Sequence, residues 1–237
     1  TGSILDADPG VVINVRGPAL NLSAGTGSIG LSGHALRIDA SVAAGALNAS
    51  ALTGINAIDL SAGLGIGTVT SATGAIALAT NDTSASGENI VFGASSLLVA
   101  TLGDVTLNVG DNIILPVGGV IDAKGAHGSD GTATLIADYA AIDADSGVGA
   151  LIDLQGTITA AAVAISGGRD IDTYVIRRVA ANSPMTISTV NAADVIRVGS
   201  NATSAGNSGG LLSTIAATLT IHGGIDGLAY IDLDNTG

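Results

Sequence analysis

The sequence predicts an all-β protein: a right-handed parallel β-helix, or β-solenoid, with about three short strands in each turn of the coil. Three observations predict this fold class. Short strand-like phrases recur every eight to ten residues over much of the chain, aliphatic residues alternate with small polar ones inside the phrases, and glycine separates one phrase from the next. We call one full turn of the coil a rung.

The first three phrases show the alternation most clearly. They are ALNLS, SIGLS and ALRIDA, which begin at Ala19, Ser28 and Ala35. Successive side chains of a strand point to opposite faces, so the aliphatic residues of each phrase face inward and their polar neighbours face solvent. Further strands are expected within 55–62, 67–71, 74–80, 88–94, 96–100, 104–109, 112–117, 119–123, 132–145, 150–156, 157–166, 170–180, 185–188, 194–200, 217–223 and 229–234.

The joints between phrases favour a coil over a sandwich of hairpins. Two-residue hairpins prefer Asn-Gly or Asp-Gly, whereas these joints are GTG, LGD, VGD and GG. We therefore expect rungs of roughly 20–27 residues, about nine to twelve rungs, and a rod of about 45–60 Å. The polar segments 80–89, 123–131 and 200–210 are expected to leave the coil and return.

Composition supports the fold class and excludes several functions. Hydrophobic residues make up 47% of the 237 residues, yet there are only four aromatic side chains, so the core must be aliphatic. The acidic residues are 19 Asp and one Glu, and the net charge is −13. This charge argues against nucleic-acid binding and against docking on anionic lipid. No apolar run reaches the roughly 18 residues that a membrane-spanning helix needs, so no membrane insertion is expected.

The rhythm of the phrases changes around Pro184. We expect solenoid repeats over 1–180 and a continuation with a second repeat type over 181–237. The chain starts TGSILDADPG and stops DLDNTG, which we interpret as a segment of a longer chain.

Two stretches resemble known repeats. ALNLSAGTGSIGLSG, AIDLSAGLGIGTVTS and LGDVTLNVGDNIIL, within 17–123, resemble filamentous-haemagglutinin-type β-helix repeats. The stretch 194–237 is similar to a second repeat of giant bacterial surface proteins, which runs from DxhxVG through a polar loop to an Asp-rich end. The resemblance implies a parallel β-helix within a very long secreted or cell-surface protein that serves adhesion, a fibre or a cell coat.

Paired carboxylates are the first candidates for chemistry. Asp170 with Asp172, Asp143 with Asp145, and Asp232 with Asp234 lie two residues apart, and each pair is expected to share a strand face. Such pairs suit calcium or acid–base chemistry, although solvated outer faces and corner residues are the favoured explanation, ahead of calcium and then of catalysis. The glycine-aspartate stretches 167–172 and 223–234 lack the full spacing of a calcium loop, so calcium stays a possible ligand and no metal residue is assigned.

The remaining polar residues indicate no catalytic or cofactor-binding group. Four arginines in the last third could sit beside calcium-binding aspartates, as in pectate-lyase-like β-helix enzymes, or pair with neighbouring Asp. These are Arg169, Arg177, Arg178 and Arg197. The histidines His34, His127 and His222 are isolated, and Lys124 lacks a phosphate-binding glycine run. The T-x-T pairs are too irregularly spaced for an ice-binding face.

The leading hypothesis is a non-catalytic structural segment of an extracellular or cell-surface filament, coat or adhesin. It would associate end to end along the solenoid axis and could contact a host or matrix surface. One alternative is a carbohydrate-binding or carbohydrate-cleaving β-helix, which would need aromatic stacking by Phe92, Tyr139, Tyr174 or Tyr230. Another is a calcium-stabilised repeat module.

Overall fold

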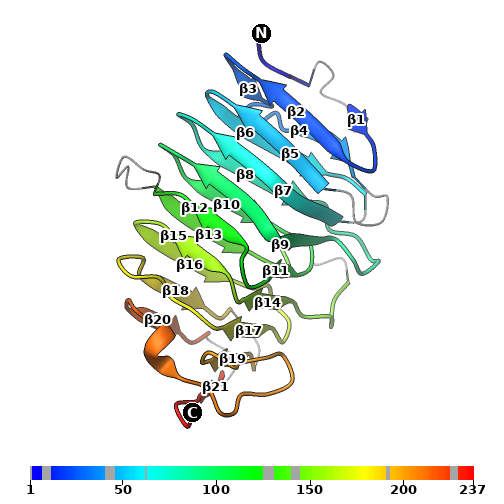
Figure 1. Cartoon of the computed structure of the whole chain (residues 1–237). Helices are drawn as coiled ribbons and strands as arrows, with labels where there is room; N and C mark the ends of the chain where they lie inside the picture. The colour runs from blue at the N-terminus through cyan, green and yellow to red at the C-terminus, as the bar shows by residue number, and fades with distance from the viewer. Residues whose placement is uncertain are drawn as a thin grey trace.

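The fold is described from a computed structural model, and it consists of two parallel β-sheets that run the length of the molecule (Figure 1). The structure describes residues 2–6, 12–40, 46–61, 63–124, 131–139, 145–190, 193–224 and 229–237. All pairings between named strands in these ranges are parallel, and the chain alternates between the sheets as it climbs. The predicted parallel β-helix class is confirmed.

We call the two sheets sheet A and sheet B. Sheet A contains β1 (Val15–Arg16), β3 (Ser28–Ile29), β4 (Leu36–Asp39), β6 (Gly54–Asp59), β8 (Ile76–Thr80), β10 (Val105–Asn108), β13 (Thr132–Ile136), β16 (Ala162–Ser166), β18 (Met185–Ser188) and β20 (Leu219–His222). Sheet B contains β2 (Leu20–Ala24), β5 (Ala46–Ala51), β7 (Gly63–Ser71), β9 (Asn89–Ala100), β11 (Ile113–Leu115), β12 (Val120–Asp122), β14 (Leu151–Leu154), β15 (Thr157–Thr159), β17 (Thr173–Ile176), β19 (Val195–Val198) and β21 (Tyr230–Leu233). The helical structure among the described residues is one short 3-10 turn, η1 (Leu212–Thr214), and none of it is long and apolar enough to span a membrane.

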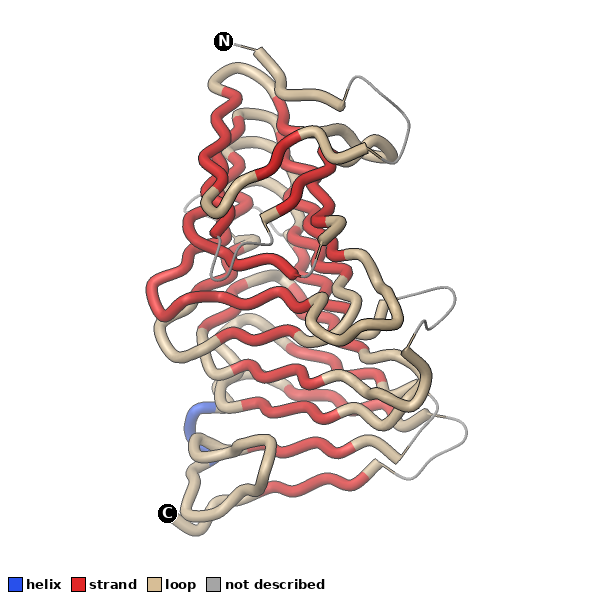
Figure 2. Tube along the Cα trace, turned by 90° about the vertical axis from the view of Figure 1, so that its right-hand side faces the viewer, coloured by secondary structure: helices blue, strands red, loops and turns tan. Residues whose placement is uncertain are grey.

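The register between strands fixes the length of each rung. Ile55 lies opposite Ile76, a rung of 21 residues, whereas Met185 lies opposite Leu219, a rung of 34 residues. The longest rungs therefore exceed the predicted range of 20–27, because loops at the corners add residues without adding strand. Figure 2 shows the strands of the C-terminal half stacked as nearly level layers, with the loops projecting from the corners.

The number of strands per rung varies along the coil. The rungs β10–β11–β12 and β13–β14–β15 have three strands, as predicted, whereas each rung from β16 onward has one strand in each sheet. The difference arises in sheet B, where the long strand β9 pairs with both β11 and β12. Pro116 and Gly119 stand between β11 and β12, and Gly119 donates a turn hydrogen bond of 3.0 Å to the Pro116 carbonyl. A tight turn thus separates β11 from β12, although both strands pair with the single long strand β9.

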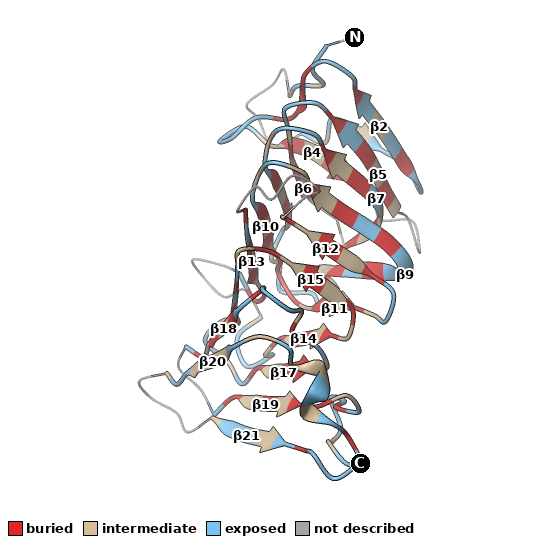
Figure 3. Cartoon of the chain, turned by 60° about the vertical axis from the view of Figure 1, so that its left-hand side comes forward, coloured by how far each residue is buried: buried red, intermediate tan, exposed pale blue. Residues whose placement is uncertain are grey.

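Inward-facing side chains form continuous columns that make the core. One column of sheet B passes through Ile90, Ile113, Ile152, Tyr174 and Ile196, all fully buried. Its neighbours on the same strands are mostly half-buried or exposed, as the banding in Figure 3 shows. The aliphatic residues of the alternating sequence pattern therefore form the core, and the residues between them form the surface.

The loop between β19 and η1 folds back over the outer face of sheet B. Val175 occupies an outward position on β17, yet it is completely buried. Arg177 and Arg197 hold the loop through hydrogen bonds to the carbonyls of Ala202 (2.6 Å) and Ser204 (2.7 Å). The predicted loop 200–210 does leave the coil, and it returns as an ordered cover.

The two ends of the solenoid differ. At the N-terminal end, Ile4 and Val15 pack against the core, and an ion pair of 3.0 Å joins Asp6 to Arg37. At the C-terminal end, the inward residues Ile231 and Leu233 of β21 are 45% and 59% exposed. Their counterparts one rung earlier, on β19, are buried, so the last described rung leaves the core uncovered.

Candidate functional site

A row of buried carboxylates follows the corner where the chain passes from sheet A to sheet B. The row is contributed by residues that end a sheet A strand or precede a sheet B strand, and we call it the acidic corner. Its members are Asp39, Asp59, Glu88, Asp111, Asp138, Asp172 and Asp194, all buried. Buried Asp is uncommon in proteins unless it is paired or hydrogen-bonded, so this corner is the most unusual chemistry of the described chain.

The carboxylates bind backbone N–H groups of the preceding rung. Asp59 accepts a hydrogen bond from the N–H of Ala40 (2.9 Å), and Asp111 accepts one from Glu88 (2.8 Å). Farther along, Asp172 accepts from Ala150 at 2.8 Å. At each of these corners an Asp carboxylate thus accepts a hydrogen bond from a backbone N–H group that precedes a strand of sheet B. Without this bond, the N–H group would be a buried donor without a partner, which costs free energy.

The C-terminal half of the acidic corner is the most strongly perturbed. Asp172 is fully buried, and its own N–H donates to the Asp194 carboxylate at 2.9 Å. The pKa of Asp172 is raised to about 7, mainly by burial; the Ala150 N–H opposes this shift, and the charges of Asp194, Asp138 and Asp170 add to it. Burial also raises the pKa of Asp194. Asp172 is therefore mostly protonated at mildly acidic pH.

Tyr174 brings its hydroxyl into this part of the corner. The hydroxyl accepts a hydrogen bond of 2.7 Å from the N–H of Gly167, and the ring lies in the core column. Burial first, and then the carboxylates of Asp172 and Asp194, raise the pKa of Tyr174 above its ordinary value. The tyrosine therefore stays neutral, and its hydroxyl contributes a polar group beside Asp172 without adding charge.

Two glycines make the space that these carboxylates occupy. A Cβ atom at Gly167 would overlap the Asp172 carboxylate and approach the Tyr174 hydroxyl, and one at Gly168 would overlap the Asp138 carboxylate. The Gly-Gly pair after β16 is thus required by the packing of neighbouring rungs, in addition to any freedom that it gives the turn.

The structure separates the predicted carboxylate pairs. Asp170 and Asp172 precede β17 instead of lying on a strand, and only Asp172 enters the core, whereas Asp170 accepts a hydrogen bond of 2.6 Å from Gly147. The expectation of a shared strand face is wrong for this pair, because the chain is still turning the corner. Asp145 is half-buried, and Asp143 lies outside the described residues.

The third predicted pair is divided in the same way. Asp232 is half-buried on β21, opposite Arg197, whereas Asp234 follows the strand and is buried. Asp234 accepts a hydrogen bond of 2.7 Å from the N–H of Gly210, which is the main cause of its lowered pKa. Asp234 thus ties the end of the chain to the loop that covers sheet B.

The four arginines do not form the enzyme-like arrangement. Arg177 and Arg197 donate to loop carbonyls, and Arg169 and Arg178 are exposed. Arg177 and Arg197 hydrogen-bond to carbonyls of the covering loop, while the charge of Arg177 also opposes the effect of burial, which raises the pKa of Asp153, and Arg197 lies opposite Asp232.

The histidines and aromatic residues are dispersed. His34 and His222 are exposed, and His127 lies outside the described residues. Phe92 and Tyr174 are buried in the core, which leaves Tyr139 and Tyr230 exposed. These two tyrosines stand three rungs apart, roughly 14 Å along the axis, which is too far for a shared stacking platform.

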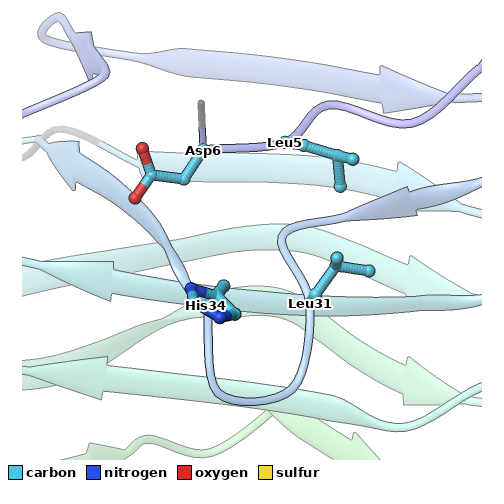
Figure 4. Close-up of a pocket in the computed structure, with 4 residues that line it drawn as sticks. All are labelled: Leu5, Asp6, Leu31 and His34. Atoms are coloured by element: carbon cyan, nitrogen blue, oxygen red, sulfur yellow. The ribbon is translucent and has the colours of Figure 1, made fainter. Parts of the chain in front are cut away.

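Two hollows lie on the surface of the described residues, and neither gathers several carboxylates. One, of about 300 Å³, is lined by Leu5, Asp6, Leu31 and His34 at the N-terminal end (Figure 4). Another, of about 320 Å³, lies over the outer face of β2, β5 and β7 and is lined mainly by Asn, Ser and Thr. Within the described ranges no three His, Asp or Glu side chains are arranged to hold a metal ion.

The acidic corner carries a signal in the sequence that the strand-pair interpretation missed. Asp stands at the end of, or just after, an alternating phrase in RIDA, AIDLS, LNVGDN and LIADY, and just before one in DIDTYV and AADVIRV. Reading these positions as corners of stacked rungs, and not as strand faces, would have predicted a single row of carboxylates.

Comparison of the chain with family models, with curated proteins and with solved structures finds no match.

Proposed function

We propose that this chain is a non-catalytic structural segment of an extracellular or cell-surface filament, coat or adhesin. The observation that carries the proposal is the uniform core. The column through Ile90, Ile113, Ile152, Tyr174 and Ile196 is apolar from rung to rung, so each rung is held mainly by its neighbours above and below. Such a stack gives length and stiffness without requiring a pocket.

The chemistry of the buried groups fits the same proposal. Asp59, Asp111 and Asp172 point their carboxylates at backbone N–H groups of an adjacent rung, which makes them structural ligands of the chain itself. A catalytic pair would instead converge on a hollow that a substrate can enter. The repeat resemblance at 17–123 and 194–237 supports a place outside the cell, and a host or matrix surface as a partner.

The carbohydrate alternative has less support from the side chains. A sugar-binding or sugar-cleaving groove needs aromatic faces beside acidic groups, and the two exposed tyrosines are three rungs apart.

The calcium alternative would need oxygen ligands gathered around one point. Thermal melting with calcium and with chelator tests it, and we expect the same midpoint in both.

A scattering and binding experiment tests the structural role. Small-angle X-ray scattering of the chain should give an elongated particle whose long axis is roughly 45 Å for nine stacked rungs. A panel of acidic and neutral polysaccharides should show neither saturable binding nor chain cleavage. Release of new sugar ends, or saturable binding to one polysaccharide, would replace the scaffold with the carbohydrate hypothesis.

A further inference from the structure

The Asp172 carboxylate has few hydrogen-bond donors compared with its counterpart at an earlier corner. Asp59 accepts hydrogen bonds from the N–H of Ala40 and from both the N–H and the hydroxyl of Ser61. Asp172 accepts one N–H, that of Ala150, on its Oδ1 atom. Its Oδ2 atom is completely buried and, among the described residues, meets no donor in hydrogen-bonding geometry. An ionised Asp172 is therefore a buried charge with far less support than Asp59 has.

The charges that act on Asp172 are all negative. They belong to carboxylates of its own corner and of the corners one rung before and one rung after, namely Asp170, Asp138 and Asp194. Tyr174 of β17 faces this cluster with a neutral hydroxyl, and Arg169, in the same corner, is exposed to solvent. Repulsion between charges inside a protein is screened much less than at its surface, so ionising Asp172 works against the closed packing of the corner.

The segment 167–172, which joins β16 to β17, closes the corner over these carboxylates. A Cβ atom at Gly167 would lie 1.8 Å from Oδ2 of Asp172, and one at Gly168 would lie 1.7 Å from Oδ2 of Asp138. Water can thus reach an ionised Asp172 only if this segment moves. Arg169 and Ile171 are exposed, so their side chains do not hold the segment in the core, and the two glycines give its backbone freedom to turn.

We propose that segment 167–172 is a pH-sensitive latch, which stays closed over Asp172 while that carboxyl is protonated and moves away from the core when it ionises. Each rung of a solenoid contacts only its neighbours, so one corner can open while the rungs farther along stay folded. The inference goes beyond the proposed structural function, because it gives the rod one joint that loosens with pH.

The direction of the switch follows from the two states of the corner. Burial raises the pKa of Asp172 to about 7 in the closed corner, whereas contact with water returns it toward about 3.9. The open state thus binds fewer protons between these two values. Opening becomes easier as the pH rises from about 4 to about 7, and it changes little above that range.

Hydrogen exchange followed by NMR tests the latch, because the amides of Ala150 and Asp172 are both hydrogen-bonded into the corner. After correction for the intrinsic pH dependence of exchange, their protection should fall roughly tenfold to a hundredfold between pH 5 and pH 7 and then level off. The amide of Ala40, which Asp59 accepts, is the internal control and should keep its protection. An equal loss at Ala40 would mean that the whole chain opens, which overturns a local latch.

Asp172→Asn separates titration from packing. The variant keeps an acceptor for the Ala150 N–H but has no carboxyl to ionise, so the protection of Ala150 should be the same at pH 5 and pH 7. Asp104→Asn, at an exposed position of the opposite corner, is the matched control and should retain the full loss. A loss that persists in Asp172→Asn assigns the titration to another group and overturns the proposal.

A second variant keeps Asp172 itself. Asp170→Asn removes one of the charges that act on Asp172, so the loss of protection at Ala150 should level off at a lower pH than in the natural chain. An unchanged pH dependence in this variant contradicts the like-charge account of the corner. Circular dichroism verifies that each variant is folded.

Tyr174 provides an independent readout of opening. The chain has three tyrosines and no tryptophan, so Tyr139→Phe combined with Tyr230→Phe leaves Tyr174 as the fluorescent residue. Tyr174 is fully buried, and acrylamide should quench it weakly at pH 5 and several-fold more strongly at pH 8. Equal quenching at both values overturns the opening of the corner. The structural function is tested separately by particle shape and polysaccharide binding, so either proposal can fail without the other.

Discussion

The backbone N–H of Asp172 donates a hydrogen bond of 2.9 Å to the carboxylate of Asp194, one rung farther along the solenoid. The Asp172 carboxylate in turn accepts from Ala150, one rung back. Each aspartate thus links its own rung to the one before it. The cost of this arrangement is a group of carboxylates that must be buried together, and several testable consequences follow from that burial.

Replacing Asp172 with Asn is expected to stabilise the protein above neutral pH. The amide oxygen can still accept from Ala150, while the cost of burying a charge among other carboxylates disappears. We expect a gain on the order of 3 kcal/mol at pH 8, or roughly 5–10 °C in the melting temperature. Asp104→Asn, an exposed residue at the opposite corner, is the control and should shift the midpoint by less than about 2 °C. Destabilisation at pH 8 would contradict the account.

The stability of the natural chain should fall as the pH rises. The pKa of Asp172 is about 7 in the folded protein and about 3.9 in the unfolded chain, so the unfolded state binds fewer protons between these values. The contribution of this residue is fully present below pH 4 and is lost as the pH rises through 7. Urea unfolding at pH 5 and pH 8 should show the larger free energy of unfolding at pH 5. Asp172→Asn should flatten the difference, and an unchanged slope would mean that another group titrates.

Adjacent isoleucines on β11 test the division between core and surface. Ile113 is fully buried, whereas Ile114 faces outward and is half-buried. Ile113→Ala should cost about 2–5 kcal/mol through lost burial and a cavity in the column, and Ile114→Ala less than about 1.5 kcal/mol. Equal losses in chemical denaturation would show that β11 is not held in the register described.

Gly167→Ala should be destabilising although alanine is ordinarily compatible with a corner. Its methyl group would overlap the Asp172 carboxylate and crowd the Tyr174 hydroxyl, so we expect a loss of about 1–3 kcal/mol. Gly206→Ala is the control, since a Cβ there meets no atom within 4 Å. Thermal melts of the two variants compare them directly, and a neutral Gly167→Ala would mean that Asp172 can move away.

The neighbouring residues Arg177 and Arg178 test what holds the loop over sheet B. Arg177 donates to the carbonyl of Ala202, whereas Arg178 is exposed. Arg177→Met should increase the rate of proteolytic cutting within 200–210 and expose Val175, and Arg178→Met should leave the rate near that of the natural chain. Limited proteolysis followed by mass spectrometry measures both rates. Similar rates for the two variants would show that Arg177 does not anchor the loop.

Much of the fold could be predicted because the inward-facing residues of the core recur at regular intervals along the sequence. In DVTLNV, the residues Val105, Leu107 and Val109 were expected inside, and all three are buried. The prediction needed only the two-residue period of a strand and the recurrence of the phrases. Rung length was less predictable, since residues added at a corner, as between β19 and β20, leave the alternation on either side unchanged.

The candidate site could be predicted only in part, for a related reason. The aspartates were recognised as unusual, but Asp170 and Asp172 were expected to share a strand face. Whether a residue two positions away lies on the same face depends on where the strand begins, and β17 begins at Thr173. The row of carboxylates joins Asp59, Asp111 and Asp194, residues far apart in sequence, and only the stacking of rungs brings them into one line.

By itself the sequence determined that aliphatic residues alternate with polar ones, that glycine separates the phrases, and that the core is mainly aliphatic. These are properties of neighbouring residues, and the pleat of a strand turns them directly into an inside and an outside. The tertiary structure alone decided which aspartates are buried, that Val175 is covered, and that Ile231 and Leu233 remain exposed. Those outcomes depend on what the adjacent rung or loop places against each side chain, and short-range patterns carry no information about that contact.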